Sequence, residues 1–152
     1  MTTAFYSHSD CRLHDMGRGH PECPQRLDAI DDHLLATGLE VAIERREAPL
    51  AKLSDLGLAH ASNYVSELRD LLAPLAESGE SHALDPDTLA GPGTWRAVMR
   101  AAGAAVAATD AVIDGEIRNA FCAVRPPGTT PRATRRWAFA SSTASRSRRA
   151  TR

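Results

Sequence analysis

The sequence predicts an α/β domain, and the order and composition of its segments lead to this fold class. Short runs of strand length, at residues 3–7, 39–43 and 120–124, alternate with longer segments in which apolar residues recur at helical spacing. The run at 120–124 is almost wholly apolar, as is typical of a strand inside a parallel sheet that helices cover on both faces. The length of 152 residues suits one compact domain.

Turn and capping residues set the expected boundaries of these elements. Pro24 suits the first position of a helix, and Gly38 suits its end. Thr94 follows Pro92 and Gly93 and is expected to be the N-cap of a long helix. The predicted order is strand 3–7, polar loop 8–24, helix 24–38, strand 39–43, a helical hairpin over 53–60 and 64–75, loop 77–93, helix 95–114 and strand 120–124.

Charge divides the chain into two parts, although the whole carries a net charge of only −1. Residues 1–128 hold eleven Lys and Arg against nineteen Asp and Glu, whereas residues 129–152 hold seven Arg and no acid. The second part also lacks apolar periodicity, so we expect a disordered basic tail. Such a tail can contact nucleic acid weakly and without sequence specificity, so a non-enzymatic binding module with a basic arm is one candidate function.

Compartment and targeting signals are sparse. No signal peptide is visible at the N-terminus, and no segment is long and apolar enough to predict contact with a membrane. The three cysteines cannot all pair with one another, and reduced thiols are typical of the cytoplasm. We therefore expect a cytoplasmic protein.

The loop before the first helix contains a possible zinc site. Cys11, His14, His20 and Cys23 form the pattern C-x2-H-x5-H-x2-C, and thiolate and imidazole are ligands that zinc prefers. A small zinc module is therefore a second alternative function. Against it, the gap between the two pairs is short, and a loop whose histidines bond to the backbone explains the same residues.

Two further segments carry candidate chemistry. Asp85 and Asp87 lie in one loop, where two carboxylates can take part in acid–base chemistry or hold a cation, or can form Asx turns around Pro86. Residues 125–128, Arg-Pro-Pro-Gly, follow the apolar strand and place a rigid turn at its carboxyl end. That end is where open α/β sheets bind ligands.

Several of these segments together resemble one protein family. Residues 19–27, GHPECPQRL, resemble the first active-site loop of the histone deacetylase superfamily. The nearest match is the bacterial class II-like branch, with histone deacetylase-like amidohydrolases, acetylpolyamine amidohydrolases and acetoin-utilisation proteins. Similar segments follow in the family's order, and the resemblance covers residues 1–128: HASNYVSEL at 60–68, LDPDT at 84–88, GTW at 93–95, AAGAA at 101–105 and NAFCAVRPPG at 119–128.

The resemblance implies a fold, a reaction and a set of site residues. The fold would be the N-terminal part of an arginase/deacetylase-like domain, a parallel sheet flanked by helices. The reaction in the intact family is zinc-dependent removal of acetyl or other acyl groups from lysine side chains or polyamines. The implied site residues are Arg26, His20 and Pro21 at the substrate and acetate channel, Asp85 and Asp87 at the pocket rim, and Pro126, Pro127 and Gly128 at the active-site strand end.

The chain departs from the family pattern after Gly128. Thr129 and Thr130 stand where the family has its catalytic pair of histidines, and the family's zinc-binding residues and late tyrosine do not follow. Loss of one base explains the change, because GGC CAC CAC GCC for Gly-His-His-Ala then reads Gly-Thr-Thr-Pro, as at 128–131. In the displaced frame, the bases of residues 136–143 allow Met-Gly-Phe-Cys-Leu-Phe-Asn, a string of the family. We therefore expect a truncated, inactive fragment that retains no catalytic residue and binds no zinc at the family site.

Overall fold

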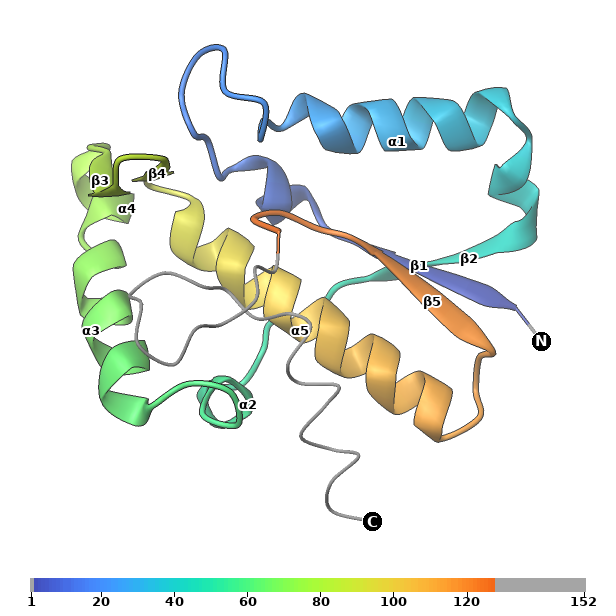
Figure 1. Cartoon of the computed structure of the whole chain (residues 1–152). Helices are drawn as coiled ribbons and strands as arrows, with labels where there is room; N and C mark the ends of the chain where they lie inside the picture. Colours follow the sequence, from blue (N-terminus) through green and yellow to red (C-terminus); the bar gives the residue numbers. More distant parts are fainter. Residues whose placement is uncertain (1, 128–152) are drawn as a thin grey trace.

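The computed structural model describes residues 2–127, and in them a three-stranded parallel sheet lies between two helices (Figure 1). The strand order is β2-β1-β5, with β1 at Thr3–Ser7, β2 at Ile43–Glu47 and β5 at Asn119–Ala123. Both outer strands run parallel to β1, so Phe5 is the partner of Arg45 on one side and of Phe121 on the other. The predicted α/β class is confirmed.

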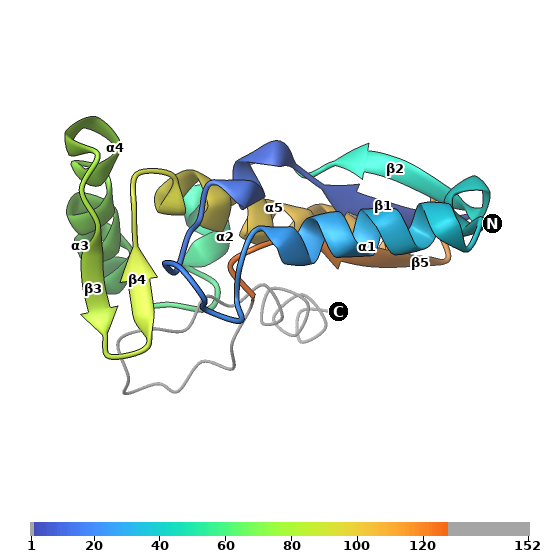
Figure 2. The same cartoon turned by 90° about the horizontal axis from the view of Figure 1, so that it is seen from above.

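Helices pack against both faces of this sheet, α1 (Gln25–Ala36) on one and α5 (Thr94–Ile113) on the other (Figure 2). The α1 face holds a buried cluster that includes Phe5, Cys11 and Leu27. The α5 face is lined by small residues, among them Ala104 and Ala108, which let the helix lie close to the strands. The predicted helices at 24–38 and 95–114 and the strand at 3–7 therefore hold to within a residue or two.

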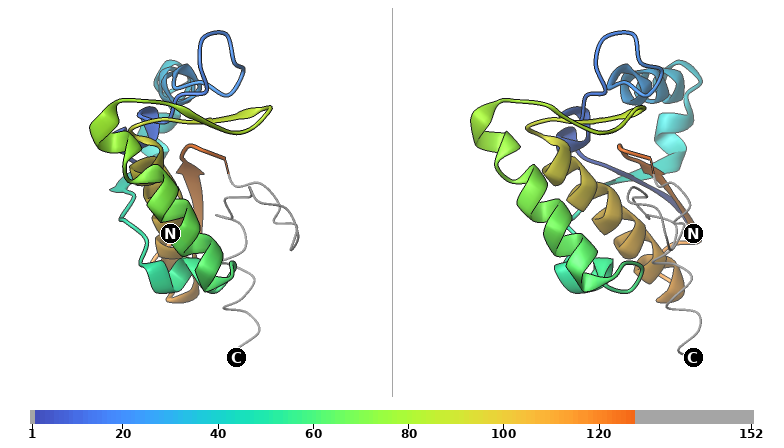
Figure 3. Two further views of the ribbon diagram at one scale, coloured as in Figure 1. Left: turned by 90° about the vertical axis from the view of Figure 1, so that its left-hand side faces the viewer. Right: turned by 60° about the vertical axis from the view of Figure 1, so that its left-hand side comes forward.

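A second group of elements flanks α5 and lies away from the sheet (Figure 3). It comprises α2 (Leu53–Leu56), α3 (Ser62–Leu72), α4 (Leu75–Ser78) and an antiparallel hairpin of β3 (His82–Asp85) and β4 (Thr88–Ala90). Leu68 and Leu72 of α3 pack with Ala90 of β4 in a third buried cluster. This group positions the hairpin, and with it Asp85 and Asp87, near the loop that follows β1.

Two of the predicted elements and one predicted helix cap are wrong. Residues 39–42 form a 3-10 turn (Leu39–Ala42), not a strand, and Val41 is 93% exposed, so the apolar alternation there faces solvent. Residues 77–93 are not only loop, because they contain the end of α4 and the β3–β4 hairpin. Thr94 is the first residue of α5 and Gly93 is its N-cap, and the Thr94 hydroxyl accepts a hydrogen bond from the Gly91 N–H.

The apolar strand is also less covered than predicted. Only Ala123 of β5 is buried, and Phe121 is 51% exposed. The reason is that β5 pairs with β1 alone among the described residues, so one of its edges is open.

Two expectations concern residues beyond this part of the chain. The predicted disorder and nucleic-acid contact of 129–152 fall outside the described residues, as do Gly128, Thr129 and Thr130. A further expectation concerned membranes. Within residues 2–127, no helix has the length and apolar character needed to cross one.

Candidate functional site

The candidate site lies at the carboxyl ends of β1 and β5. These strands are parallel neighbours, so the segments that follow them, residues 8–24 and 124–127, leave the sheet at the same edge. The first segment begins with a 3-10 turn (Ser9–Arg12) and then reverses direction at Gly17 and Gly19, whose φ angles of 91° and 84° favour glycine. The predicted turn at the end of the apolar strand therefore faces the predicted active-site loop.

A buried arginine joins these two segments. The Arg125 side chain is fully buried, and its Nε and Nη2 donate to the two carboxylate oxygens of Glu22 at 2.7 and 2.6 Å. Its Nη1 donates to the His14 carbonyl at 2.8 Å. Such a forked ion pair fixes both orientation and distance, so it holds the loop against the end of β5.

The charge of Glu22 is maintained by this contact. Burial acts to raise the pKa of the Glu22 carboxyl, but the hydrogen bond and charge of Arg125 outweigh it and hold the pKa below its usual range. Arg26 at the start of α1 adds a second ion pair to the same carboxylate at 2.8 Å. Glu22 is therefore an anion at neutral pH.

His14 connects the loop to the N-terminal end of α5. Its Nδ1 lies 3.1 Å from Thr94 Oγ1, and that oxygen accepts a hydrogen bond from the Gly91 N–H at 2.9 Å. Its Nε2 lies 3.9 Å from Glu22 Oε2. Burial lowers the pKa of His14, with the Glu22 charge opposing the shift, so a neutral imidazole is favoured at neutral pH.

The predicted rim residues meet the loop at the surface. Asp87 Oδ1 lies 3.4 Å from His20 Nε2, and the Asp87 N–H donates to Asp85 Oδ1 at 2.8 Å. A hollow of about 230 Å³ opens there, lined by Met16, His20, Asp85, Asp87 and neighbours of the hairpin. Two carboxylates at the mouth of a hollow can attract a cationic group, and His20 is the neighbouring donor or acceptor.

The other predicted site residues lie around the same edge of the sheet. Arg26 is half exposed and bound to Glu22, and Pro21 is exposed on the loop beside it. Pro126 is buried and Pro127 is exposed at the end of the described chain. The structure thus gathers the predicted residues that it describes at one end of the molecule.

The small zinc module is not supported by this geometry. No three His, Cys, Asp or Glu side chains within residues 2–127 converge as metal ligands, and Cys11, His14, His20 and Cys23 are no exception. Cys11 lies in the core with Phe5 and Leu27, and burial raises its pKa, which disfavours the thiolate that zinc requires. As arranged in this structure, the described residues therefore do not fit a zinc ion.

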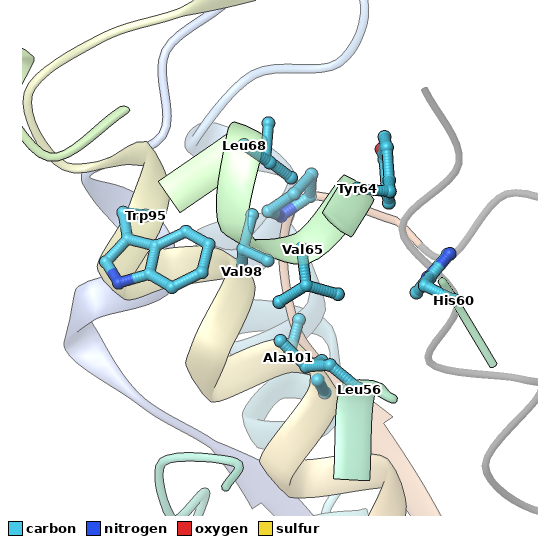
Figure 4. A pocket seen from close by; sticks show the side chains of 10 residues that line it. Leu56, His60, Tyr64, Val65, Leu68, Trp95, Val98 and Ala101 are labelled. Carbon is cyan, nitrogen blue, oxygen red and sulfur yellow. The ribbon is translucent and has the colours of Figure 1, made fainter. Parts of the chain in front are cut away.

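A second, apolar depression lies between α3 and α5 (Figure 4). His60, Tyr64, Val65 and Leu68 line it from the segment at 60–68, and Trp95 lies at its other end. Its free volume of about 20 Å³ is close to that of one water molecule, so it has no room for a substrate. Burial lowers the pKa of His60, and its ring lies 5.3 Å from that of Tyr64, which fits a packed, neutral histidine.

Comparison with known proteins assigns the fold and the family of this chain. The chain matches the solved structure of the HDA15 HD domain with a TM-score of 0.82 and 23% sequence identity. The match covers 99% of this chain and 44% of that one. This likeness establishes the fold. The family model described as "Histone deacetylase domain" matches residues 20–129, so the chain belongs to the histone deacetylase family.

Curated relatives agree with this assignment. The chain is 34% identical over 110 residues to a histone deacetylase-like amidohydrolase of Pseudomonas aeruginosa, covering 72% of this chain and 28% of that protein. It is 35% identical over 133 residues to the human polyamine deacetylase HDAC10, covering 84% and 20%. A probable deacetylase of Archaeoglobus fulgidus is 32% identical over 130 residues, covering 84% and 34%. The chain therefore spans between a fifth and about a third of the length of these relatives.

Sequence reasoning missed the residues that organise this site. Glu22 and Arg125 are 103 positions apart, and nothing local in either segment indicates the pairing. The one available signal was Arg125, a charged residue that directly follows the apolar run at 120–124. If such a side chain is buried, it needs a residue of opposite charge beside it. Thr94 was predicted only as a helix cap, so its contact with His14 was missed as well.

Proposed function

We propose that the domain to which this chain belongs removes acetyl or other acyl groups from lysine side chains or polyamines, and that the 152-residue chain itself is an inactive N-terminal part of that enzyme. The observation that carries the proposal is the Arg125–Glu22 pair, which fixes the loop GHPEC against the strand end that leads to Gly128 and Thr129. Membership of the histone deacetylase family supports the reaction class.

The hollow beside His20 would contribute recognition of the amine. Asp85 and Asp87 present carboxylates at its mouth, and an acetylated lysine peptide or polyamine carries cationic or N–H groups near the scissile amide. Arg26, at the start of α1, forms an ion pair with Glu22 of the loop and would attract the acetate product. In this proposal the described residues bind and orient the substrate, and none of them transfers a proton.

Loss of the reading frame after Gly128 would explain the inactivity. Thr129 and Thr130 replace the family's histidine pair, and a threonine hydroxyl does not exchange protons near neutral pH as an imidazole does. Zinc in the intact family polarises the amide and activates water, and its ligands would come from the restored frame, since residues 2–127 do not supply them. We also propose a cytoplasmic location, which the three free cysteines support.

The test compares this chain with a version whose gene carries one inserted base at the Gly128–Thr129 junction. Both proteins are incubated with zinc and with an acetyl-lysine peptide or an N-acetylated polyamine, and the released acetate is measured. We expect no release above the blank from the 152-residue chain and turnover by the restored one. Removing positioned acid–base groups lowers the catalytic rate by about 10²–10⁴-fold, and loss of the metal site removes the remaining activity. Acetate release by the unrestored chain would contradict the proposal.

Amine recognition has its own variants in the restored protein. Removing the rim charges by Asp85→Asn with Asp87→Asn should raise KM for the cationic substrate about fivefold, equivalent to ~1 kcal/mol, and leave a neutral acetamide unchanged. Asp114→Asn, at the C-terminal end of α5, is the matched control, and it should change the KM of neither the cationic nor the neutral substrate. An equal loss on neutral and cationic substrates would show that the rim does not recognise charge.

A further inference from the structure

The His14 side chain lies between two polar contacts and is almost fully buried, with 3% of its surface exposed. Its Nδ1 faces Thr94 Oγ1 of α5 at 3.1 Å, and its Nε2 faces Glu22 Oε2 of the loop at 3.9 Å. A neutral imidazole carries one ring proton, so one nitrogen donates and the other accepts. The surroundings of the two nitrogens therefore decide which of them is protonated.

On the Nδ1 side, Thr94 can supply a proton. Its side chain is fully buried, and its hydroxyl oxygen accepts a hydrogen bond from the Gly91 N–H at 2.9 Å. The hydroxyl proton can then point at His14, because a hydroxyl group donates one proton in addition to the lone pairs with which it accepts. When Nδ1 accepts from Thr94, the proton of the neutral ring is on Nε2.

On the Nε2 side, the charges favour an N–H. The five N–H groups of Arg125 are all directed at other acceptors, namely the two Glu22 carboxylate oxygens and the carbonyls of Cys11, His14 and Glu22. The Glu22 carboxylate faces Nε2, and a negative charge at 3.9 Å attracts an N–H more than a lone pair. Burial lowers the pKa of His14, and the Arg125 charge adds to this against the opposing charge of Glu22, so the ring is neutral at neutral pH. Both sides of the ring thus favour the same tautomer.

We propose that His14 is a positioning residue, which Thr94 holds as the Nε2–H tautomer so that this N–H orients the Glu22 carboxylate toward Arg125. The effect on catalysis rests on the proposed function. In that enzyme the chain after Arg125 leads to the histidine pair that would follow Gly128, so the orientation of the ion pair sets how this pair approaches the substrate. His14 acts through Glu22 and Arg125 and does not itself contact the substrate.

Long-range proton–nitrogen NMR spectra of the isotopically labelled 152-residue chain test the tautomer, because protonated and unprotonated ring nitrogens have well-separated shifts. At neutral pH we expect His14 to be protonated at Nε2 alone, and the spectrum of His14→Phe identifies its signals. Thr94→Val, which keeps the shape and removes the hydroxyl, should give a mixture of tautomers, and Thr94→Ser should restore the single one. The control Thr109→Val removes a hydroxyl that bonds to the Ala105 carbonyl of the same helix and should leave His14 unchanged.

Four results would overturn the assignment. These are a ring protonated at Nδ1, a ring protonated at both nitrogens, signals averaged between the two tautomers, and a spectrum of His14 that Thr94→Val does not alter. The first three are read from the unsubstituted chain, so the test does not depend on whether a variant folds.

Kinetics of the protein with the restored reading frame test the positioning role. His14→Phe keeps a ring of similar size, removes both polar contacts, and should lower kcat about tenfold at an unchanged KM. His14→Gln can place an amide N–H near the position of the Nε2–H and should retain most of the kcat. Equal losses in the two variants, or a change confined to KM, would contradict this role. If the restored protein with His14 in place releases no acetate, the proposed function fails, and the spectrum of the 152-residue chain alone decides whether His14 is held as proposed.

Discussion

Replacing Glu22 by Gln should destabilise the fold far more than its position in a surface loop suggests. The Arg125 side chain is fully buried, and Glu22, only 16% exposed, is its one anionic partner among residues 2–127, at 2.6–2.7 Å. Glutamine keeps the shape and one acceptor oxygen but removes the negative charge. The substitution therefore leaves a guanidinium in the interior with carbonyl oxygens as its acceptors.

The size of the effect follows from these contacts. Removing one partner of a buried ion pair typically costs ~3–5 kcal/mol, because the other charge stays buried without compensation. The carbonyl acceptors and the remaining amide oxygen offset part of this, so we expect a loss of about 3 kcal/mol in the free energy of unfolding. Domains of this size are stable by only ~5–15 kcal/mol, so the loss is a large fraction of the total.

Urea unfolding followed by far-UV circular dichroism measures this difference. The matched control is Arg26→Gln, which removes the half-exposed arginine from the same carboxylate and should cost less than about 1 kcal/mol. If Glu22→Gln loses less than about 1 kcal/mol, or if Arg26→Gln loses as much as Glu22→Gln, the ion pair does not hold the loop in the way described.

Two further predictions concern pH and packing. Acidification should lower the free energy of unfolding, measured as urea midpoints between about pH 8 and 2. Burial lowers the pKa of His14, so its contribution is present above the unfolded value of 6.5 and is lost below it. Burial acts to raise the pKa of Glu22, but Arg125 outweighs burial and lowers it. Glu22 therefore stabilises the fold above its unfolded pKa of 4.5, and this stabilisation is lost as the pH falls through the folded pKa. A free energy of unfolding that does not change with pH would contradict both assignments. A Cβ at Gly103 would overlap the Pro49 carbonyl oxygen, so Gly103→Ala should cost ~1–3 kcal/mol of stability, measured by thermal melts. The control Ala105→Ser, on the same helix, should cost less than ~0.5 kcal/mol. Equal melting temperatures for the two would show that α5 does not approach that segment so closely.

Local patterns predicted the elements whose residues are buried along one face. The long helix ending at Ile113 was found from periodicity, because its apolar residues do face the core, and Thr3–Ser7 was predicted as a short mixed run of strand length. The run at 39–43 alternates as a strand does, but Leu39 and Val41 are exposed, and the true strand, Ile43–Glu47, is mostly charged. An edge strand that is protected by ion pairs does not show a strand pattern.

The site was predicted as separate pieces and not as an arrangement. The resemblance implied that His20 and Asp87 belong to one pocket. In the structure His20 Nε2 lies 3.4 Å from Asp87 Oδ1, although the two residues are 67 positions apart in the sequence. The pairing of Glu22 with Arg125 and the contact of His14 with Thr94 depend on how the loop crosses the sheet edge. Such long-range contacts follow from tertiary packing, which residue spacing does not record.

The coding DNA across the Gly128–Thr129 junction tests the central claim most directly. Our account predicts that adding one base there restores Gly-His-His, then Met-Gly-Phe-Cys-Leu-Phe-Asn, and then an open frame with an Asp-x-His motif for the metal. A displaced frame that meets an early stop, or that reads through without these residues, would contradict it.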